Sequence, residues 1–495
     1  MVPEHTEQED SQSDDSAGPY PGASHQNRAA GLSANPFIQS ALLILVTFFL
    51  YRSTLGGGFH FDDQVLLLNA PALGKSSIFT QFLNYEMGRP VTLLSFRLNH
   101  ALGGNNPFSY HLFNVIIHCL NVTLLYLLVY VTLAGKQGTS TVPSSFAPFV
   151  ACLLFGVHPL QTQAVNYIWA RSSLLATSFF LASLNAYAIA LRAKRAKGVF
   201  TTLGLISYML ALGSKPIAAT LPAILLMYDL FFVSRFAWAE IMKRWRLYAV
   251  SLVVTLILIT KVLLASESSK YGVGFGIEGI TPLHFFYTQL SVIVRYLALL
   301  IYPADLSLDY DFPIATSLIS LPVLLAFVLH ASLVVYALLI CRDKPLLGFS
   351  ILWFYVTLAP SSSFIPAVDF IFEHHAYLPS AGAAFAVAAL AGAALKYRRA
   401  MVLSRPPIVA IGIVYVCLVV LSAVATVRRN GIWEDDVGLW EDTVKKSPGK
   451  ARPHNNLGNA LFSRGSFTRA ALEFEEALRI NPAARCPSSK KLRRN

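Results

Sequence analysis

Long apolar stretches recur along most of this chain, and shorter polar stretches separate them. A helix needs roughly 20 apolar residues to cross the hydrocarbon core of a bilayer. Because lipid offers no hydrogen-bond partners to the backbone, such a series predicts a bundle of transmembrane helices. Twelve apolar segments can be delimited, at residues 37–55, 110–134, 146–158, 172–191, 199–213, 216–233, 246–265, 285–302, 318–341, 346–360, 376–395 and 407–427.

The composition supports the same class of protein. Of the 495 residues, 55% are hydrophobic and 13% are charged, whereas a soluble domain carries about 25% charged residues. The predicted class is therefore an all-α, polytopic membrane protein. The net charge of +12 does not require a nucleic-acid partner, since Lys and Arg collect in the cytoplasmic loops of membrane proteins. The five cysteines show no spacing typical of a metal site or a disulfide framework.

The chain divides into parts of different character. Residues 1–36 are rich in Ser, Asp, Glu, Gly and Pro, which predicts a disordered cytoplasmic tail. This tail lacks the basic start and early apolar region of a cleavable signal. Residues 37–427 form the predicted multi-span domain, with a long external loop at 56–109. Residues 428–483 are predicted to form a partial repeat module, and 484–495 a basic tail.

Basic clusters predict how the chain is threaded through the membrane. With a cytoplasmic N-terminus, all clusters fall on the cytoplasmic side only if segment 285–302 does not cross completely. This segment contains Arg295 and ends before Pro303, which suits a partly inserted segment buried in protein. We therefore predict about 11 spans plus one partly inserted segment; twelve spans with an imperfect charge bias remain the alternative. The clusters lie at 192–197, 243–246, 342–344 and 396–399.

The segment after the last apolar stretch reproduces the spacing of a tetratricopeptide repeat, two antiparallel helices in about 34 residues. Gly458 and Ala470 allow the two helices to approach closely, and Pro482 ends the second helix. Trp440 and Pro448 repeat the pattern one period earlier, which predicts half of a preceding repeat. An amphipathic helical hairpin resting on the membrane domain remains the alternative.

Two adjacent acids, Asp62 and Asp63, follow the first apolar segment at the predicted external surface. A carboxylate can act as a general base that accepts the proton of an attacking hydroxyl. The second carboxylate would raise the pKa of the first or orient the acceptor. Alternatively, the pair would help to hold a divalent cation through oxygen ligands. A solvated pair of loop acids is the other interpretation that remains open.

A second polar group, Glu373, His374 and His375, directly precedes an apolar segment. Ionisable groups at the start of a membrane helix are costly in lipid and usually face a cavity. These three side chains are therefore candidates to contact a phosphate or an acceptor. An interfacial helix cap is the alternative.

Single cations on the predicted external face are candidates to bind a lipid phosphate. Arg171 opens one apolar segment, Lys215 lies between two others, and Arg89 lies in the first loop. The planar guanidinium of Arg matches phosphate geometry, but for any single one of these cations a snorkelling interfacial side chain is the better explanation. Asp309 and Tyr310 follow the partly inserted segment, either as contacts to a substrate or as ordinary loop residues.

Taken together, these residues resemble the transmembrane and tetratricopeptide-repeat O-mannosyltransferases, and especially their bacterial membrane relatives. The order of the matching stretches makes the resemblance more specific than any single motif. The stretches lie at 61–63, 89–92, 110–114, 158–165, 214–215, 308–310, 372–374, 377–380 and 440–442, in order over residues 56–482.

The resemblance implies a membrane fold of the GT-C type and a polyprenyl- or dolichyl-phosphate sugar as donor. Protein Ser or Thr hydroxyls are the implied acceptors, and mannose is the expected sugar. The implied catalytic residues are Asp62, Asp63, Glu373 and His374. The candidates for binding the donor phosphate are Arg89, Arg171, Lys215 and His375, and further site candidates are His158, Asp309, Tyr310 and Tyr377.

Three positions distinguish this chain within the resemblance. Gln163 is typical of the bacterial branch, where we expect Glu in the animal proteins. Pro216 stands where the family pattern has Glu, and His375 stands where it has Arg. If that Arg contacts the donor phosphate, His375 replaces it only when protonated, or other cations take over its role.

The expected function is transfer of a sugar from the lipid-linked donor to proteins, and the repeats are a candidate surface for binding these acceptors. A non-catalytic membrane scaffold that presents the repeats, and a transporter of lipid-linked sugar, are the alternatives. No cofactor beyond the donor is assigned, a divalent cation stays open, and no nucleic acid is expected. The expected location is the bacterial cytoplasmic membrane, or the endoplasmic reticulum membrane in a eukaryote, with the repeats external.

Overall fold

The computed structural model describes residues 35–68, 89–134, 145–193, 195–265, 274, 275, 277, 279–400 and 406–482. Within these residues every regular element is a helix, so the predicted all-α class is confirmed for the described part of the chain. Most of the predicted N-terminal tail, residues 69–88 of the first external loop and the predicted basic tail lie outside it.

A helix coincides with each of the predicted apolar segments. Six helices of the described residues are long and apolar enough to cross a membrane, or up to seven if one bent pair counts as a single span. The total number of spans stays a prediction. The bundle consists of α2 (Pro36–Leu50), α5 (Pro107–Ala134), α6 (Phe146–Val157), α8 (Arg171–Ala190), α9 (Lys197–Ser214), α10 (Leu221–Tyr228), α12 (Trp245–Ala265), α13 (Pro282–Ile301), α14 (Leu321–Ile340), α15 (Pro345–Leu358), α16 (Tyr377–Ala381), α17 (Ala383–Ala400) and α18 (Pro406–Ile432).

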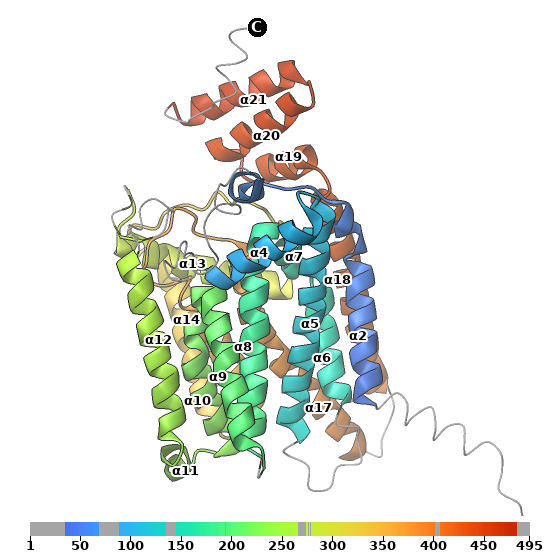
Figure 1. Ribbon diagram of the computed structural model, residues 1–495, viewed down its shortest axis with the longest axis vertical. Coiled ribbons are helices and arrows are strands. Elements are labelled where there is room, and N and C mark those ends of the chain that lie inside the picture. Colours follow the sequence, from blue (N-terminus) through green and yellow to red (C-terminus); the bar gives the residue numbers. More distant parts are fainter. Residues whose placement is uncertain are drawn as a thin grey trace, which may run out of the picture.

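Helix α13, which covers the segment predicted to be partly inserted, lies across the bundle rather than along it (Figure 1). The chain after α13 doubles back along it, since the amide of Ala315 donates to Thr288 Oγ1 at 2.9 Å. Val323, in the first turn of α14, packs in one cluster with Leu290 of α13. The segment 282–320 therefore returns to the side where it began, an arrangement compatible with partial insertion, although α13 is long enough to span.

Aromatic side chains fill the centre of the bundle. Trp353 of α15 contacts Phe180 of α8 and Phe385 of α17, with ring centroids 5.6 and 5.9 Å apart. Gly382 lies between α16 and α17, and a Cβ there would be 2.5 Å from Trp353 Cδ1. This glycine therefore permits the bend of 40° between the two helices, which directs the chain before α16 toward the end of the bundle.

Three helices stack at one end of the bundle, α19 (Asp436–Lys446), α20 (Ala451–Ser463) and α21 (Phe467–Ile480), as Figure 1 shows. The short elements η2 (Gln64–Leu68), α4 (Pro90–Gly103) and α7 (Thr162–Asn166) lie at the same end. Gly458 and Phe474 meet where α20 and α21 cross: a Cβ on Gly458 would lie 2.6 Å from Phe474 Cε1. The close approach suits the predicted repeat spacing, while the assignment to the tetratricopeptide class stays a prediction.

The opposite end of the bundle carries α11 (Trp238–Met242) and the basic residues 243–246 that follow it. Arg192 lies just beyond the end of α8, while Arg171 begins this helix at the end near the stacked helices. The bundle therefore separates these basic residues from the predicted external elements along its long axis.

Candidate functional site

The backbone at the first predicted catalytic position is unusual. Phe61 has a φ of +53°, a left-handed conformation that is rare for aromatic residues. Its ring lies against the rings of Trp440 and Tyr167, with centroids 5.7 and 6.1 Å away. Strained conformations of this kind persist where the surrounding structure holds them, often at functional sites. The packing around Phe61 thus determines where the next residue, Asp62, is placed.

Asp63 is completely buried and binds backbone amides with both carboxylate oxygens. Its Oδ2 accepts from the amide of His60 at 3.1 Å, and its Oδ1 accepts from the amide of Trp169 at 2.7 Å. Burial raises the pKa of Asp63 to about 7, although these hydrogen bonds act in the opposite direction. The geometry therefore suits a residue that fixes the loop to the segment before α8, rather than one that faces a substrate.

Asp62 is only partly buried and has a single hydrogen-bond partner among the described residues. The hydroxyl of Tyr167 donates to its Oδ2 at 2.8 Å. Burial raises the pKa of Asp62 above its ordinary value, while Tyr167, Arg452 and Arg89 act in the opposite direction. Of the two predicted acids, Asp62 is thus the one with a carboxylate oxygen left for a substrate hydroxyl.

Arg89, which lies within electrostatic range of Asp62, belongs to a group of basic and imidazole side chains. Lys215, buried between α9 and the short helix η7 (Pro216–Thr220), donates to Ser173 Oγ at 2.8 Å. It has no ion-pair partner among the described residues. Arg89, at the start of α4, donates to Ser172 Oγ at 3.3 Å. Lys215 and Arg89 both lie within electrostatic range of His374 and His375.

The imidazole of His374 is held by Gln163, and the imidazole of His375 lies against that of His374. Gln163 Oε1 accepts from the amide of His374 at 2.8 Å and lies 2.9 Å from its Nδ1. The rings of His374 and His375 are 4.7 Å apart, and the ring of Tyr167 lies 6.1 Å from that of His374. The structure therefore brings Asp62, His374, His375, Lys215 and Arg89 into one site.

Glu373 does not join this group, although it precedes His374 in the sequence. It is buried, and its Oε1 accepts from the amide of Ser307 and from the hydroxyl of Tyr310, both at 2.7 Å. Its other oxygen has no hydrogen-bond partner among the described residues, and Arg429 and Lys446 supply nearby positive charge. Glu373 and Tyr310 therefore connect the segment after α13 to the chain before α16.

Arg171 is enclosed by protein rather than exposed to a ligand. Its guanidinium donates to Asn114 Oδ1 at 2.7 Å, to the carbonyl of Tyr110 at 3.0 Å and to Asn99 Oδ1. The ring of Phe96 lies 4.4 Å from its central carbon. Every nitrogen of the guanidinium thus binds protein, so Arg171 cross-links α4, α5 and α8 and the structure does not favour its predicted contact with phosphate.

His158 and Tyr377 have hydrogen-bond partners outside the group around Asp62. His158 Nδ1 accepts from the amide of Leu160 at 3.3 Å. The hydroxyl of Tyr377 lies 2.6 Å from His118 Nδ1 and accepts from Asn121 at 3.1 Å. Both side chains have structural partners that account for them.

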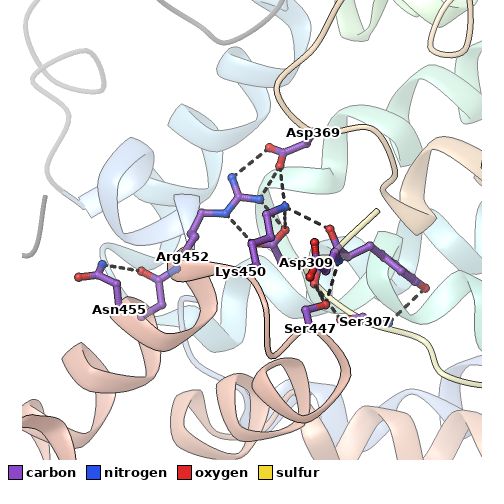
Figure 2. Close-up of polar contacts among 10 residues, drawn as sticks. Ser307, Asp309, Asp369, Ser447, Lys450, Arg452 and Asn455 are labelled. Atoms are coloured by element: carbon purple, nitrogen blue, oxygen red, sulfur yellow. Dashed lines mark hydrogen bonds and ion pairs between the residues drawn. The ribbon is translucent and has the colours of Figure 1, made fainter. Parts of the chain in front are cut away.

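Asp309 forms ion pairs with two cations from the stacked helices. Lys450 Nζ lies 2.5 Å from Asp309 Oδ1, and Arg452 Nε lies 2.6 Å from Asp309 Oδ2. Figure 2 shows this group together with Asp369, which Arg452 also contacts. Sequence reasoning missed Arg452, Asp369 and Tyr167, because each is an ordinary residue of its own segment and only the tertiary contacts reveal its connection to the site.

No group of three or more His, Cys, Asp or Glu side chains among the described residues is arranged to hold a metal ion. Both oxygens of Asp63 already accept from amides, so the geometry gives no support to a cation held between Asp62 and Asp63.

The comparisons with known proteins point to one class, the curated protein O-mannosyl-transferases. The chain is 26% identical over 465 residues to the Caenorhabditis elegans protein O-mannosyl-transferase F38B6.6. This alignment covers 89% of the chain and 63% of that protein. It is 25% identical over 500 residues to human TMTC3, which covers 89% of the chain and 51% of the relative. A segment of 151 residues, 28% of the chain, is 36% identical to human TMTC2, over 17% of that relative.

The chain therefore spans about half to two thirds of the length of the relatives it matches over most of its own length. No protein-family model matches the chain. No solved structure matches it either.

Proposed function

We propose that the chain is a membrane glycosyltransferase of the GT-C type. It transfers mannose from a polyprenyl- or dolichyl-phosphate donor to Ser or Thr hydroxyls of proteins. One observation carries the proposal: a carboxylate open to a substrate, Asp62, lies within electrostatic range of Arg89. Arg89 in turn groups with the buried Lys215, which has no acidic partner among the described residues. The names of the relatives support the class of reaction.

The proposed reaction is a single displacement with inversion at the anomeric carbon. Asp62 accepts the proton of the acceptor hydroxyl as its oxygen attacks the sugar. The bond between the anomeric carbon and the phosphate oxygen breaks, and its electron pair leaves with the lipid phosphate. Lys215 and Arg89 stabilise the negative charge that grows on the phosphate, in an environment where few other charges compensate it.

This assignment accounts for the presence of His375 where the family pattern has Arg. A neutral imidazole donates only one N–H and brings no charge to the phosphate. Arg89 carries positive charge in our proposal, and Lys215, whose pKa is lowered by burial and by Arg89, is protonated when the phosphate binds beside it. His375 contributes a hydrogen bond. His374, held by Gln163, shapes the same side of the site.

The proposed orientation places the site on the external face of the bacterial cytoplasmic membrane, with the N-terminus cytoplasmic. The site and the stacked helices α19–α21 lie at the same end of the bundle (Figure 1), and the basic residues 243–246 lie at the other. Basic loops favour the cytoplasmic side. Acceptor proteins would then reach the site beside the proposed repeats.

The test is a transfer assay with the full-length protein in lipid nanodiscs. The donor is polyprenyl-phosphate mannose, and the acceptors are a mixture of Ser- and Thr-containing peptides, with mass spectrometry to detect the products. We expect an increase of one hexose in mass with the wild type and loss of transfer with Asp62→Asn. Asp343→Asn, an exposed acid outside this site, is the matched control.

Failure of the folded wild-type protein to transfer any sugar would contradict the proposal and favour the scaffold. Release of the intact donor on the opposite side of sealed vesicles would favour the transporter. A chelator added to the assay shows whether a divalent cation takes part.

A further inference from the structure

The turn between α19 and α20 reaches the segments that surround Asp62. Arg452, in the first turn of α20, binds Asp309 through Nε and Nη2, both at 2.6 Å. Its Nη1 also donates to Asp369 Oδ2 at 3.1 Å. Asp309 follows α13, and Asp369 precedes the segment that carries His374. Figure 2 shows the guanidinium placed between the two acids. One side chain of the stacked helices thus binds two separate loops of the membrane domain.

The partners of Arg452 are firmly held. Asp309 is 2% exposed, and it also accepts from Lys450. Burial would raise the pKa of Asp309, but Arg452 and Lys450 keep it below its ordinary value. Ser447 donates to the carbonyl of Asp309 at 2.7 Å. The cluster contains two acids and two cations, so its charges balance, and the partners of Arg452 hold its guanidinium in place.

The same guanidinium covers the residue that precedes the proposed base. The central carbon of Arg452 lies 5.3 Å from the centroid of the Phe61 ring, a cation–π distance. Phe61 has the left-handed backbone described above, so the position of its ring and the direction of Asp62 are coupled. Arg452 also lies within electrostatic range of Asp62.

We propose that Arg452 is a positioning residue for Asp62, contributed to the site by the stacked helices. It holds the Phe61 ring so that the Asp62 carboxylate faces the acceptor, and its charge favours the ionised carboxylate. The inference rests on the proposed function, in which Asp62 is the base. The stacked helices α19–α21 thereby form part of the site in addition to any role in binding acceptor proteins.

Charged side chains from several elements act on Asp62, so the proposal predicts the direction in which each substitution shifts the pKa of Asp62. Arg452 from α20 and Arg89 from α4 favour its ionised form. Asp369 and the neighbouring Asp63 oppose it. Removal of Arg452 therefore makes Asp62 harder to ionise, whereas removal of the Asp369 charge makes it easier.

The experiment is the pH dependence of kcat/KM for peptide mannosylation by the full-length protein, whose acidic limb reports the proton-accepting group of the free enzyme. The variants are Arg452→Gln, Arg452→Lys and Asp369→Asn. Arg469→Gln is the matched control, because Arg469 is in the same stack and its ion pair with Glu441 is exposed. Size-exclusion chromatography and thermal melting confirm folding.

For Arg452→Gln we expect kcat to fall about tenfold, with the acidic limb displaced to higher pH and the KM for the lipid donor unchanged. For Asp369→Asn we expect a displacement of the limb to lower pH. For Arg452→Lys we expect the acidic limb to return toward its wild-type position, because the positive charge is present again. We expect kcat to recover only in part. A residue that merely supports the fold would lower the melting temperature without displacing the limb in opposite directions.

Wild-type kcat and an unchanged limb in folded Arg452→Gln would overturn the inference. If Arg452→Gln does not fold, Asp369→Asn decides, and a limb that stays in place or moves to higher pH overturns it. Full activity of Asp62→Asn would instead overturn the assignment of the base, whatever the Arg452 variants do. The two failures are therefore distinguishable.

Discussion

The two adjacent acids, Asp62 and Asp63, are expected to respond in opposite ways to the same substitution by Asn. An Asn at position 63 has one acceptor oxygen and an NH2 group that only donates, so with the same geometry it can accept from only one of the two amides, those of His60 and Trp169. The other amide faces the new NH2 group and stays buried without a partner, at a cost of roughly 1–3 kcal/mol. At position 62, an Asn oxygen can still accept from Tyr167, so we expect stability to change by less than about 0.5 kcal/mol.

For activity we expect the reverse: the substitution of Asp62 has the large effect and that of Asp63 the small one. Asn cannot accept a proton at neutral pH, and loss of a general base typically lowers kcat by about 10²–10⁴-fold. Asp62→Asn should therefore melt like the wild type and be nearly inactive. Asp63→Asn should melt several degrees lower, while its folded fraction keeps kcat within about tenfold of the wild type.

The assay combines thermal melting in detergent with mannosyl transfer per folded molecule, and Asp343→Asn serves as the surface control. An Asp63→Asn protein that melts like the wild type and is inactive, beside an active Asp62→Asn protein, would refute this division of roles.

The pH dependence of stability provides a second check. Burial raises the pKa of Asp63 from 3.8 to about 7, so the folded protein binds a proton there that the unfolded chain releases. The stability contributed by this position therefore decreases as the pH rises from about 4 to about 7, and the difference between wild type and Asp63→Asn narrows over that range.

Three further substitutions probe the site and its supports. Lys215→Met should raise the donor KM or lower kcat so that kcat/KM falls about 10–100-fold, since a charge-assisted contact contributes about 1.5–3 kcal/mol; unchanged donor kinetics would remove Lys215 from the phosphate site. Arg171→Gln should lower the melting temperature through loss of a buried polar network and leave the donor KM of the folded protein unchanged; a selective rise in that KM would restore the direct phosphate contact. Gly458→Ala should destabilise α20 against α21 by about 1–3 kcal/mol through overpacking on Phe474, and normal melting of this variant would contradict the close approach.

Hydropathy predicted the helices because burial in lipid depends on local composition alone. The apolar segments and the small residue at Gly458 are each encoded within one stretch of chain, whereas the prediction for α13 depended on basic clusters along the whole chain. The adjacent acids were also recognisable, since two charges directly after an apolar span are costly unless they are used. What the pattern left open was which acid faces the substrate, since that depends on the amides of His60 and Trp169.

The roles of several other residues were not predictable from local patterns. Glu373 and His374 are neighbours in the short 3-10 helix η10 (Glu373–Ala376). Successive side chains of such a helix diverge around its axis, so Glu373 faces Tyr310 while His374 faces the site. Arg171 has the residue type of a phosphate ligand, yet its surroundings supply all its partners. Arg452 lies 143 residues from Asp309 in the chain, a pairing that no local pattern indicates.

The packing of Phe61 on Trp440 also has a consequence for biogenesis. The ribosome makes the loop that bears Asp62 before it makes α19, the helix that carries Trp440, and more than 350 residues separate the two segments. His60 illustrates the same dependence through its 2.5 Å contact with Asp436. The proposed base therefore reaches its working position only after the helices between the two segments have been inserted. A chain that ended before α19 would therefore lack the aromatic and ionic contacts that hold the loop of the proposed base.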